Sequence, residues 1–497
     1  MMLEILLEII APGNLLMMNL GMAAGIIIGA LPGLSVILAI TVLLPFTFGM
    51  SSLPGMFLLL GAYCGATYGG SITAILINTP GTPNAAATVL DGYPMAQQGR
   101  AGDALKAALV GSTFGGMVSC LALIFLAPLL AQFALKFGPA EYFSLCIFGL
   151  SVVISISGGS IAKGVVMAGL GLLLSTVGID PLEGISRFRF GRSELLGGIT
   201  TAALLLGVFA VGEILMKSYA GEKGSGKILE YQKATVKIRD IFRYWKTMLH
   251  SSFLGVFIGA VPGTGGAIAA FLSYNITRSR SKRPEEFGNG CLEGVVAPET
   301  ANNAVTGATL IPLLTLGVPG DAGMAVMFGA LTMQGITPGP ALFTDDKFWV
   351  CCIMGGLILI NLFMLLQGSF FLRLFTNVTR VPVEVLIPCI MIFCTLGGFS
   401  VRNMVFDIAV VLICGFFGYW MKRFGYPLSP LVISLVLGSL TETNLRRAMV
   451  LSKGSISIFF AKPLSLTFLI IAVLILCMPL IKRALSAGKS SNRRGVI

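Results

Sequence analysis

Long apolar runs recur along almost the whole chain, and this feature constrains the fold more than any other. They lie near residues 15–48, 54–78, 106–132, 141–178, 199–216, 249–276, 303–335, 348–376, 382–398, 404–421, 427–441 and 464–481. Many approach the roughly 20 residues that a helix needs to cross a bilayer. Since a chain in lipid must satisfy its own backbone groups, the sequence predicts an all-α polytopic membrane protein with roughly ten to twelve transmembrane segments.

Charged residues are scarce, and their scarcity excludes several classes of protein. They make up 11% of the chain, against about 25% in a soluble domain, which excludes a soluble enzyme, a nucleic-acid-binding module and a secreted disulfide scaffold. None of the 10 cysteines forms a Cys-x-x-Cys pair, and His250 is the single histidine. We therefore expect buried, unpaired cysteines, no metal centre and no cofactor.

Basic residues are unevenly placed and predict the sidedness of the chain. None occurs before Arg100, whereas residues 217–248 and the tail are rich in Lys and Arg. Such segments stay on the cytoplasmic side. The predicted organisation is a first membrane repeat (1–216), a basic cytoplasmic loop (217–248), a second membrane repeat (249–484) and a basic cytoplasmic tail (485–497).

The two halves share a pattern. Gly25-Ile-Ile-Ile-Gly29-Ala-Leu-Pro32-Gly33 matches Gly255-Val-Phe-Ile-Gly259-Ala-Val-Pro262-Gly263, and a later segment ending Pro80-Gly81 corresponds to one ending Pro319-Gly320. Glycines four residues apart lie on one helix face and allow another backbone to approach closely. The nine-residue pattern occurring twice, at corresponding places, predicts internal structural repeats.

Each Pro-Gly pair falls within an apolar run and predicts a broken helix, because Pro removes a backbone donor and Gly permits unusual dihedral angles. Such breaks belong inside protein or beside a water-filled cavity, and paired breaks in two halves indicate a transporter binding site. Basic residues flank both ends of 249–276 but neither end of the first-half counterpart. We therefore expect two hairpins that enter the membrane from opposite sides, as inverted repeats would. Two ordinary kinked helices are the alternative.

Small polar residues gather beside the breaks. The predicted substrate-binding residues are Pro32, Gly33, Ser35, Ser71, Thr73, Pro262, Gly263, Thr264, Asn302 and Asn303. Free backbone N–H groups, hydroxyls and amides would hold an anion there. The predicted cation-coupling residues are Asn78, Thr79, Gly81, Glu299, Pro319 and Gly320, acting through oxygen atoms. Helix–helix hydrogen bonding is an equal alternative for Ser71 and Thr73.

The acidic residues of apolar segments permit more than one interpretation. Glu299 either carries a proton, binds a cation or caps a helix at the membrane edge, because a buried acid is costly unless it is used. Glu213 and Asp407 have no evident partner in the sequence. Asp180 and Glu183 lie close in sequence to Arg187, Arg189 and Arg192, which predicts a solvated loop network.

Several motifs together resemble the large membrane subunit of the tripartite tricarboxylate transporters. They include GALPGLS (29–35), YGGSITAILINTPG (68–81), GAVPGTGG (259–266), LTLGVPG (314–320) and MQGITPGPALF (333–343). The matches occur in order between about residues 20 and 465 and cover most of the chain.

The resemblance implies secondary active uptake of a di- or tricarboxylate, such as citrate, across a bacterial inner membrane. It further implies a small four-helix membrane subunit, a periplasmic solute-binding protein and a Na+ or H+ gradient as driving force. The hairpins also look like those of elevator-type carboxylate transporters. A channel or scaffold subunit without coupled transport is the alternative from another class. An intramembrane enzyme lacks a recognisable nucleophile–base pair, so we expect no enzymatic activity.

Overall fold

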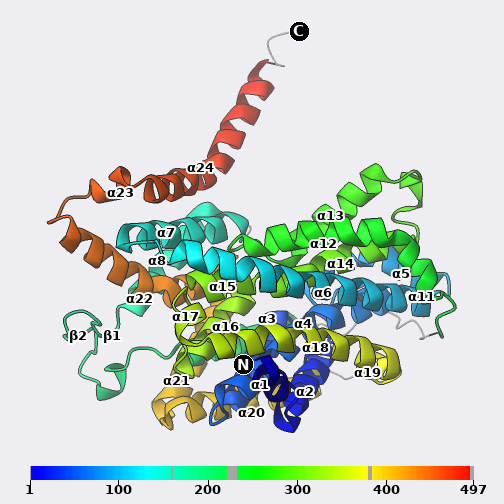
Figure 1. The fold of residues 1–497 in the computed structure, drawn as a ribbon, viewed down its shortest axis with the longest axis horizontal. Coiled ribbons are helices and arrows are strands. Elements are labelled where there is room, and N and C mark those ends of the chain that lie inside the picture. The colour runs from blue at the N-terminus through cyan, green and yellow to red at the C-terminus, as the bar shows by residue number, and fades with distance from the viewer. Residues whose placement is uncertain (1, 158–159, 221–231, 379–382, 493–497) are drawn as a thin grey trace. The chain divides into compact units, whose positions relative to one another are not determined.

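The computed structural model describes residues 2–157, 160–220, 232–378 and 383–492, and these are almost entirely helical (Figure 1). Eight helical segments in these ranges are long and apolar enough to cross a membrane: Pro12–Gly29, Ser52–Ile77, Ala101–Ala134, Pro139–Ile156, Thr201–Tyr219, Lys347–Phe370, Val405–Arg423 and Leu428–Leu451. Shorter apolar helices cover Val36–Thr47, Ile161–Ser175, Ala322–Met333, Ile387–Arg402 and Pro463–Cys477. The predicted all-α polytopic membrane fold is confirmed.

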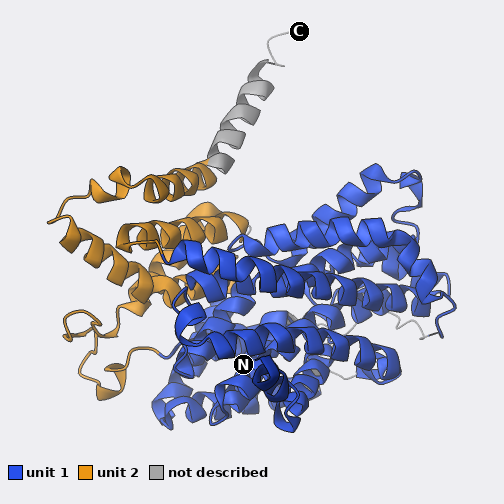
Figure 2. Cartoon of the chain, viewed as in Figure 1, with its two compact units in different colours: residues 1–135, 200–420 blue, residues 136–199, 421–497 orange. Residues whose placement is uncertain are grey.

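The chain forms two compact units, residues 1–135 with 200–420 and residues 136–199 with 421–497 (Figure 2). Unit 1 contains α1 (Met2–Ile9), α2 (Pro12–Gly29), α3 (Val36–Leu43), α4 (Ser52–Ile77), α5 (Val89–Gln97), α6 (Ala101–Ala134), α9 (Thr201–Leu205), α10 (Gly212–Ala220), α11 (Ile238–Ile241), α12 (Trp245–Ala260), α13 (Gly266–Arg280), α14 (Leu292–Ala308), α15 (Leu310–Leu316), α16 (Ala322–Met333), α17 (Leu342–Asp345), α18 (Lys347–Phe370), α19 (Leu372–Val378), α20 (Val383–Arg402) and most of α21 (Val405–Arg423).

Unit 2 contains α7 (Pro139–Ile156), α8 (Ile161–Ser175), β1 (Gly178–Ile179), β2 (Ser186–Arg187), α22 (Leu428–Leu451), α23 (Ile458–Ala461) and α24 (Pro463–Asn492). The two strands pair in antiparallel fashion. Both halves of the sequence contribute to each unit, so the division into units does not follow the division into the predicted repeats. Lys223 and Lys227 of the predicted basic loop, and Arg493 and Arg494 of the tail, lie outside the described residues.

The first broken helix, α2, packs along α4 through its glycines. A Cβ atom on Gly25 would lie 2.4 Å from the Ala62 carbonyl oxygen, and one on Gly29 would lie 2.4 Å from that of Ala66. Since residue numbers rise together along the contact, the two helices run parallel. After the turn at residues 30–35, α3 returns, so α2 and α3 form a hairpin. The helix that receives it, α4, is buried over its whole apolar length.

The second broken helix, α12, packs in the same way along α14. A Cβ atom on Gly255 would lie 2.3 Å from the Ala301 carbonyl oxygen. After its turn, α13 returns, and Arg280 Nη1 lies 3.1 Å from His250 Nε2. The outer ends of α12 and α13 therefore lie side by side, as expected for a hairpin.

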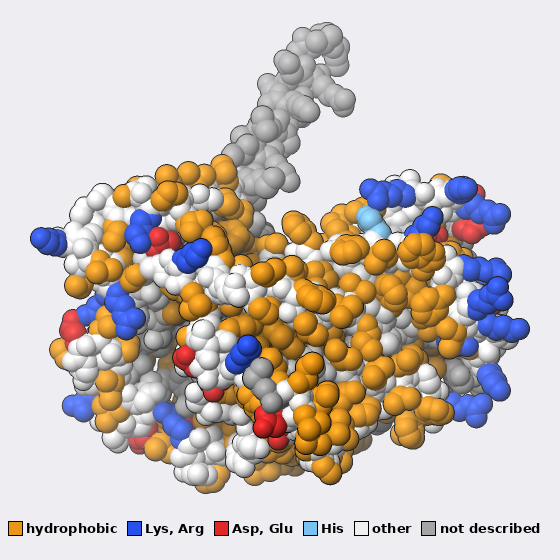
Figure 3. Space-filling view, viewed as in Figure 1, with side chains coloured by type: hydrophobic (Ala, Val, Ile, Leu, Met, Phe, Trp, Pro, Cys, Tyr) orange, Lys and Arg blue, Asp and Glu red, His pale blue; other side chains and the backbone are white. Residues whose placement is uncertain are grey.

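The outer ends of α12 and α13 are strongly basic. Figure 3 shows Lys and Arg gathered over this end of unit 1, while mainly hydrophobic side chains cover the adjoining face. The exposed basic residues in this part of the described chain include Arg239, Arg243, Lys246, Arg278, Arg280, Lys282 and Arg283.

The receiving helices α4 and α14 run in opposite directions. Tyr63, early in α4, meets Thr309 just past the end of α14, with 3.3 Å between their hydroxyl oxygens. Ser71, later in α4, lies beside Glu299 in the first half of α14. In contrast, α6 runs parallel to α14, because Gly111 contacts Val296 and Ser119 contacts Gly307 (Figure 1). Because α4 packs against the first broken helix and α14 against the second, the contact between α4 and α14 brings both broken segments into one unit.

Candidate functional site

The first break lies between α2 and α3. Gly33 adopts a left-handed backbone conformation with φ of +68°, which favours glycine. Ser35 caps α3, since its Oγ accepts the Leu38 N–H at 3.1 Å. The predicted residues Pro32, Gly33 and Ser35 therefore lie at one hairpin tip, between α2 and α3.

The end of α4 meets this region through Gly81. The helix stops at Asn78, whose φ is +59°, and the chain turns back so that Gly81 donates its N–H to the Gly70 carbonyl at 3.1 Å. A Cβ atom on Gly81 would lie 2.0 Å from the Gly29 carbonyl oxygen and 2.6 Å from Thr73 Oγ1. The structure thus places Gly81 against Thr73 and the end of α2, whereas Asn78 and Thr79 are exposed.

The second-half breaks meet directly. The Gly263 N–H donates to the Gly320 carbonyl at 2.6 Å, which joins the tip of the α12–α13 hairpin to the Pro319-Gly320 segment after α15. The Thr264 hydroxyl donates to the carbonyl of Val261 at 2.9 Å and therefore helps to hold the turn.

A buried carboxylate on α14 lies among side chains from α4, α6 and the turn before α5. Glu299 is fully buried and accepts hydrogen bonds from the Thr88 hydroxyl and from Ser112 Oγ, the latter at 3.0 Å. Ser71 Oγ lies beside the same carboxylate without a well-formed hydrogen bond. Asn303 Nδ2 donates to Ser112 Oγ at 2.8 Å. The predicted residues Ser71, Glu299 and Asn303 therefore belong to one cluster.

Thr88 and Ser112 in this cluster were not predicted. The only sequence signal for them is that each is a hydroxyl residue within or beside an apolar segment, and many such residues merely bond their own helix. Their role becomes visible only when α6 and the segment after α4 pack against α14.

Several buried polar atoms near the breaks have no hydrogen-bond partner among the described residues. They are both side-chain polar atoms of Asn302, Oδ1 of Asn303, Oγ1 of Thr82 and Oγ1 of Thr300. Asn302 also lies close to the start of α13, because a Cβ atom on Gly266 would be 2.5 Å from Asn302 Oδ1 and 2.8 Å from Asn84 Nδ2. Since each unpaired buried polar group costs about 1–3 kcal/mol, this arrangement suits a polar ligand that supplies the missing bonds.

Asp321 is a further residue that the sequence analysis missed. It directly follows Gly320. Its Oδ1 accepts the Met324 N–H at 2.8 Å and thereby caps α16. Its Oδ2 accepts the Tyr63 hydroxyl at 2.8 Å, which ties the second-half break to α4. An acidic residue immediately before an apolar helix is an N-cap signal, and that signal could have identified it.

Asp407 has a partner that its position in the sequence did not reveal. Arg402 Nε donates to Asp407 Oδ2 at 2.9 Å, and Thr200 Oγ1 donates to Oδ1 at 3.2 Å. The carboxylate is fully buried, so this ion pair joins α20 and α21 to the start of α9.

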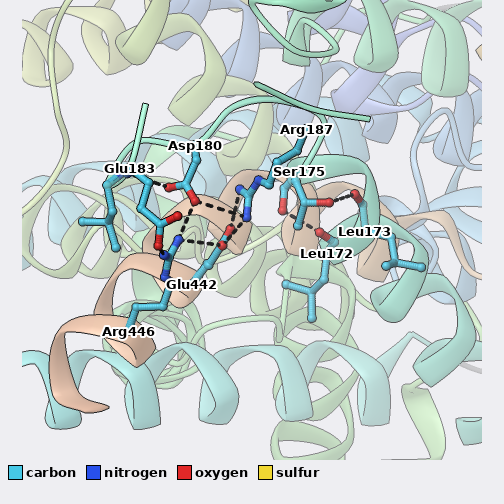
Figure 4. Close-up of polar contacts among 10 residues, drawn as sticks. Leu172, Leu173, Ser175, Asp180, Glu183, Arg187, Glu442 and Arg446 are labelled. Carbon is cyan, nitrogen blue, oxygen red and sulfur yellow. Dashed lines mark hydrogen bonds and ion pairs between the residues drawn. The ribbon is translucent and has the colours of Figure 1, made fainter. Parts of the chain in front are cut away.

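Unit 2 contains an ion-pair network between the β1–β2 loop and α22 (Figure 4). The Arg187 guanidinium forms two hydrogen bonds with Glu442, at 2.6 and 3.0 Å, and Arg446 bonds both Asp180 and Glu183. The Leu182 N–H, 2.8 Å from Asp180 Oδ1, and then Arg446 lower the pKa of Asp180 to about 2. Asp180 is buried, so the predicted loop network is anchored to a helix.

Comparison with known proteins identifies one family. The model of the tripartite tricarboxylate transporter TctA family matches residues 15–433. The chain is 39% identical over 464 residues to an uncharacterised 52.8 kDa protein in the TAR-I ttuC′ 3′ region of Agrobacterium vitis, covering 93% of this chain and 92% of that protein. It is 37% identical over 231 residues to an uncharacterised protein in the TAR-II ttuC′ 3′ region of the same organism, covering 46% and 96% respectively. No solved structure matches the chain.

Proposed function

The chain belongs to the tripartite tricarboxylate transporter TctA family, and we propose that it is the large membrane subunit of a secondary carboxylate transporter. In this proposal it resides in a bacterial inner membrane with its C-terminus in the cytoplasm. A periplasmic binding protein delivers a di- or tricarboxylate such as citrate, and a small four-helix membrane subunit completes the assembly. A Na+ or H+ gradient drives uptake.

The group of unpaired buried polar atoms beside the broken helices carries the proposal. Asn302 is 1% exposed, and neither its amide nitrogen nor its oxygen has a hydrogen-bond partner among the residues that the structure describes. A carboxylate bound between the tips would accept from the amide nitrogen of Asn302 and from backbone N–H groups at the turns. Neutral donors suit a transporter, because the substrate must leave as readily as it enters.

Glu299 is the proposed coupling residue. Its carboxylate is surrounded by the hydroxyls of Thr88, Ser112 and Ser71, and hard cations prefer such oxygen ligands. With Asn303 Oδ1 nearby, this set could hold Na+, and the same carboxylate could instead carry a proton. The Pro80-Gly81 and Pro319-Gly320 breaks would position the backbone of the two halves around Glu299.

The packing supports an inverted repeat. In the first hairpin α2 runs parallel to α4, and in the second α12 runs parallel to α14. The helices α4 and α14 are antiparallel. The hairpins therefore enter from opposite ends of the unit. With the basic ends of α12 and α13 in the cytoplasm, the first hairpin opens to the periplasm.

Transport in proteoliposomes tests this function. The chain is reconstituted with the small subunit and the binding protein, and labelled citrate and succinate are offered with inward Na+ or H+ gradients imposed separately. We expect one gradient to drive accumulation, whereas a channel or scaffold subunit would give none.

Site variants test the assignment of residues. Asn303→Ala and Ser71→Ala should reduce accumulation strongly while the protein inserts normally. Ser434→Ala is the matched control, because Ser434 is a buried hydroxyl that bonds its own helix at Leu431 O. Normal transport by the first two variants would contradict the site.

A further inference from the structure

The second hairpin places an uncapped helix N-terminus beside the proposed site. The helix α13 begins at Gly266 after Gly265, whose φ is +74°, and no side chain in the described ranges caps its first turn. Gly265 occupies the position that Ser35 has in the first hairpin, where Ser35 Oγ accepts the Leu38 N–H and caps α3. The first turn of α13 therefore keeps backbone N–H donors that in α3 are partly used.

A buried amide faces this N-terminus. Asn302 is 1% exposed, and a Cβ atom on Gly266 would lie 2.5 Å from Asn302 Oδ1 and 2.8 Å from Asn84 Nδ2. Within the described chain neither Oδ1 nor Nδ2 of Asn302 has a hydrogen-bond partner. The side chain therefore offers one acceptor and one donor at the start of α13.

A carboxylate alone satisfies only half of this amide. An ionised carboxylate has acceptor oxygens and no hydrogen to donate, so it can bond Asn302 Nδ2 and the N–H groups of α13 but not Asn302 Oδ1. A buried acceptor that is left without a donor weakens binding. The best ligand therefore brings a hydrogen-bond donor as well as a carboxylate.

The surroundings of Asn302 Oδ1 favour a hydroxyl group over a cation. The N-terminus of a helix carries a partial positive charge, and the Asn84 amide nitrogen lies close to the same Cβ position of Gly266. Both disfavour a positive ion. A hydroxyl group is neutral and supplies the single donor that Oδ1 lacks.

We propose that the start of α13 and Asn302 form a subsite for a hydroxyl group next to a carboxylate, so that the transporter selects hydroxycarboxylates over carboxylates without a hydroxyl. Asn302 Oδ1 accepts from the hydroxyl, while Asn302 Nδ2 and the first N–H groups of α13 donate to the carboxylate. The proposal rests on the proposed function, which places a carboxylate between the tips. It uses neutral groups only, as the release of substrate requires.

Two pairs of ligands that differ by one hydroxyl group test the proposal. Citrate is compared with tricarballylate, and malate with succinate, for stabilisation of the purified full chain in lipid nanodiscs. Apparent affinities follow from the concentration dependence of the unfolding midpoint, and the absence of the binding protein removes its own selectivity. We expect the hydroxylated member of each pair to bind roughly 10-fold more tightly or better, because a site that bonds a hydroxyl discriminates against the analogue lacking it.

The outcomes distinguish this subsite from the proposed function. If none of the four ligands stabilises the chain, the proposed function itself fails. If a pair binds with equal affinity, or with a preference for the member without a hydroxyl, the subsite is refuted and the proposed function stands.

Gly266→Ala locates the subsite without removing the amide. Its Cβ would lie 2.5 Å from Asn302 Oδ1, in the space that the hydroxyl requires, so the preference within each pair should fall towards unity. Gly169→Ala is the matched control, because a Cβ atom there would meet nothing within 4 Å and the preference should persist. An unchanged preference in Gly266→Ala would overturn the assignment to Asn302.

Asn302→Ala is a second variant that does not depend on recovering Gly266→Ala. It removes both polar atoms, so every ligand should bind more weakly and the hydroxylated ones should lose their advantage. Asn361→Ala is its control, since Asn361 is equally buried, has an unpaired Oδ1 among the described residues, and bonds Leu357 O on its own helix. A hydroxyl preference retained by Asn302→Ala would refute the subsite, and the wild-type comparison decides the selected class even without either variant.

Discussion

Replacing Gly81 by Ala should separate the end of α4 from the first hairpin. The new Cβ would lie 2.0 Å from the Gly29 carbonyl oxygen and 2.9 Å from Gly70 Cα. Both are backbone atoms, so no side chain can rotate to relieve the clash. The segment carrying Gly81 must move by about 1 Å or more to restore ordinary contact.

This displacement has a calculable cost. Overpacking in a well-packed core costs roughly 1–3 kcal/mol, and loss of the Gly81–Gly70 hydrogen bond adds about 1 kcal/mol. We expect a total loss of roughly 2–4 kcal/mol in the free energy of unfolding. Because a displacement of 1 Å at a binding site can reduce activity about 100-fold, transport should decline more than stability.

The assay combines the thermal unfolding midpoint in nanodiscs with uptake of labelled citrate. Gly13→Ala is the matched control, because a Cβ atom there would meet nothing within 4 Å and Ala favours the helix. We expect Gly13→Ala to equal or exceed the wild type in stability. If Gly81→Ala matched Gly13→Ala in both measurements, the close contact between the two broken segments would be refuted.

Three further predictions concern residues whose partners the structure identifies. Tyr63→Phe removes the hydroxyl that bonds Asp321 Oδ2 and should lower the free energy of unfolding by about 1–3 kcal/mol, measurable as a lower unfolding midpoint. Asp407→Asn leaves the Arg402 guanidinium without its anion and should cost roughly 3–5 kcal/mol, whereas an unchanged midpoint would contradict a structural ion pair. The folded-state pKa of Asp180 is lowered to about 2, below the unfolded value of about 3.9. Its stabilisation is therefore complete above about pH 4 and is lost as the pH falls towards 2, and Asp180→Asn should flatten that part of the midpoint-versus-pH curve.

The fold class and the broken helices were predictable from the sequence because their causes are local. A run of apolar residues is stable in lipid whatever its position in the chain, and a Pro-Gly pair interrupts a helix through its own backbone chemistry. The glycines of α2 and α12 were recognisable for the same reason, since their spacing places them on one helix face. These features depend on neighbours only a few residues away.

The composition of the site was only partly predictable. Ser71, Glu299 and Asn303 could be selected as polar residues in apolar segments, but their shared cluster could not. Asn78 and Thr79 resemble Thr73 in sequence context, yet they are exposed while Thr73 is buried. Whether a polar residue beside a break faces protein depends on what packs against it.

The sequence by itself determined that this chain is a polytopic membrane protein with two pairs of broken helices. Only the tertiary structure decided which groups meet: the hydroxyls of Thr88 and Ser112 at Glu299, Tyr63 at Asp321, and Lys217 at the Pro32 carbonyl. These partners lie between 185 and 258 residues apart. Contacts over such separations follow from how whole helices pack, and no pattern within a single helix encodes which distant helix will face it.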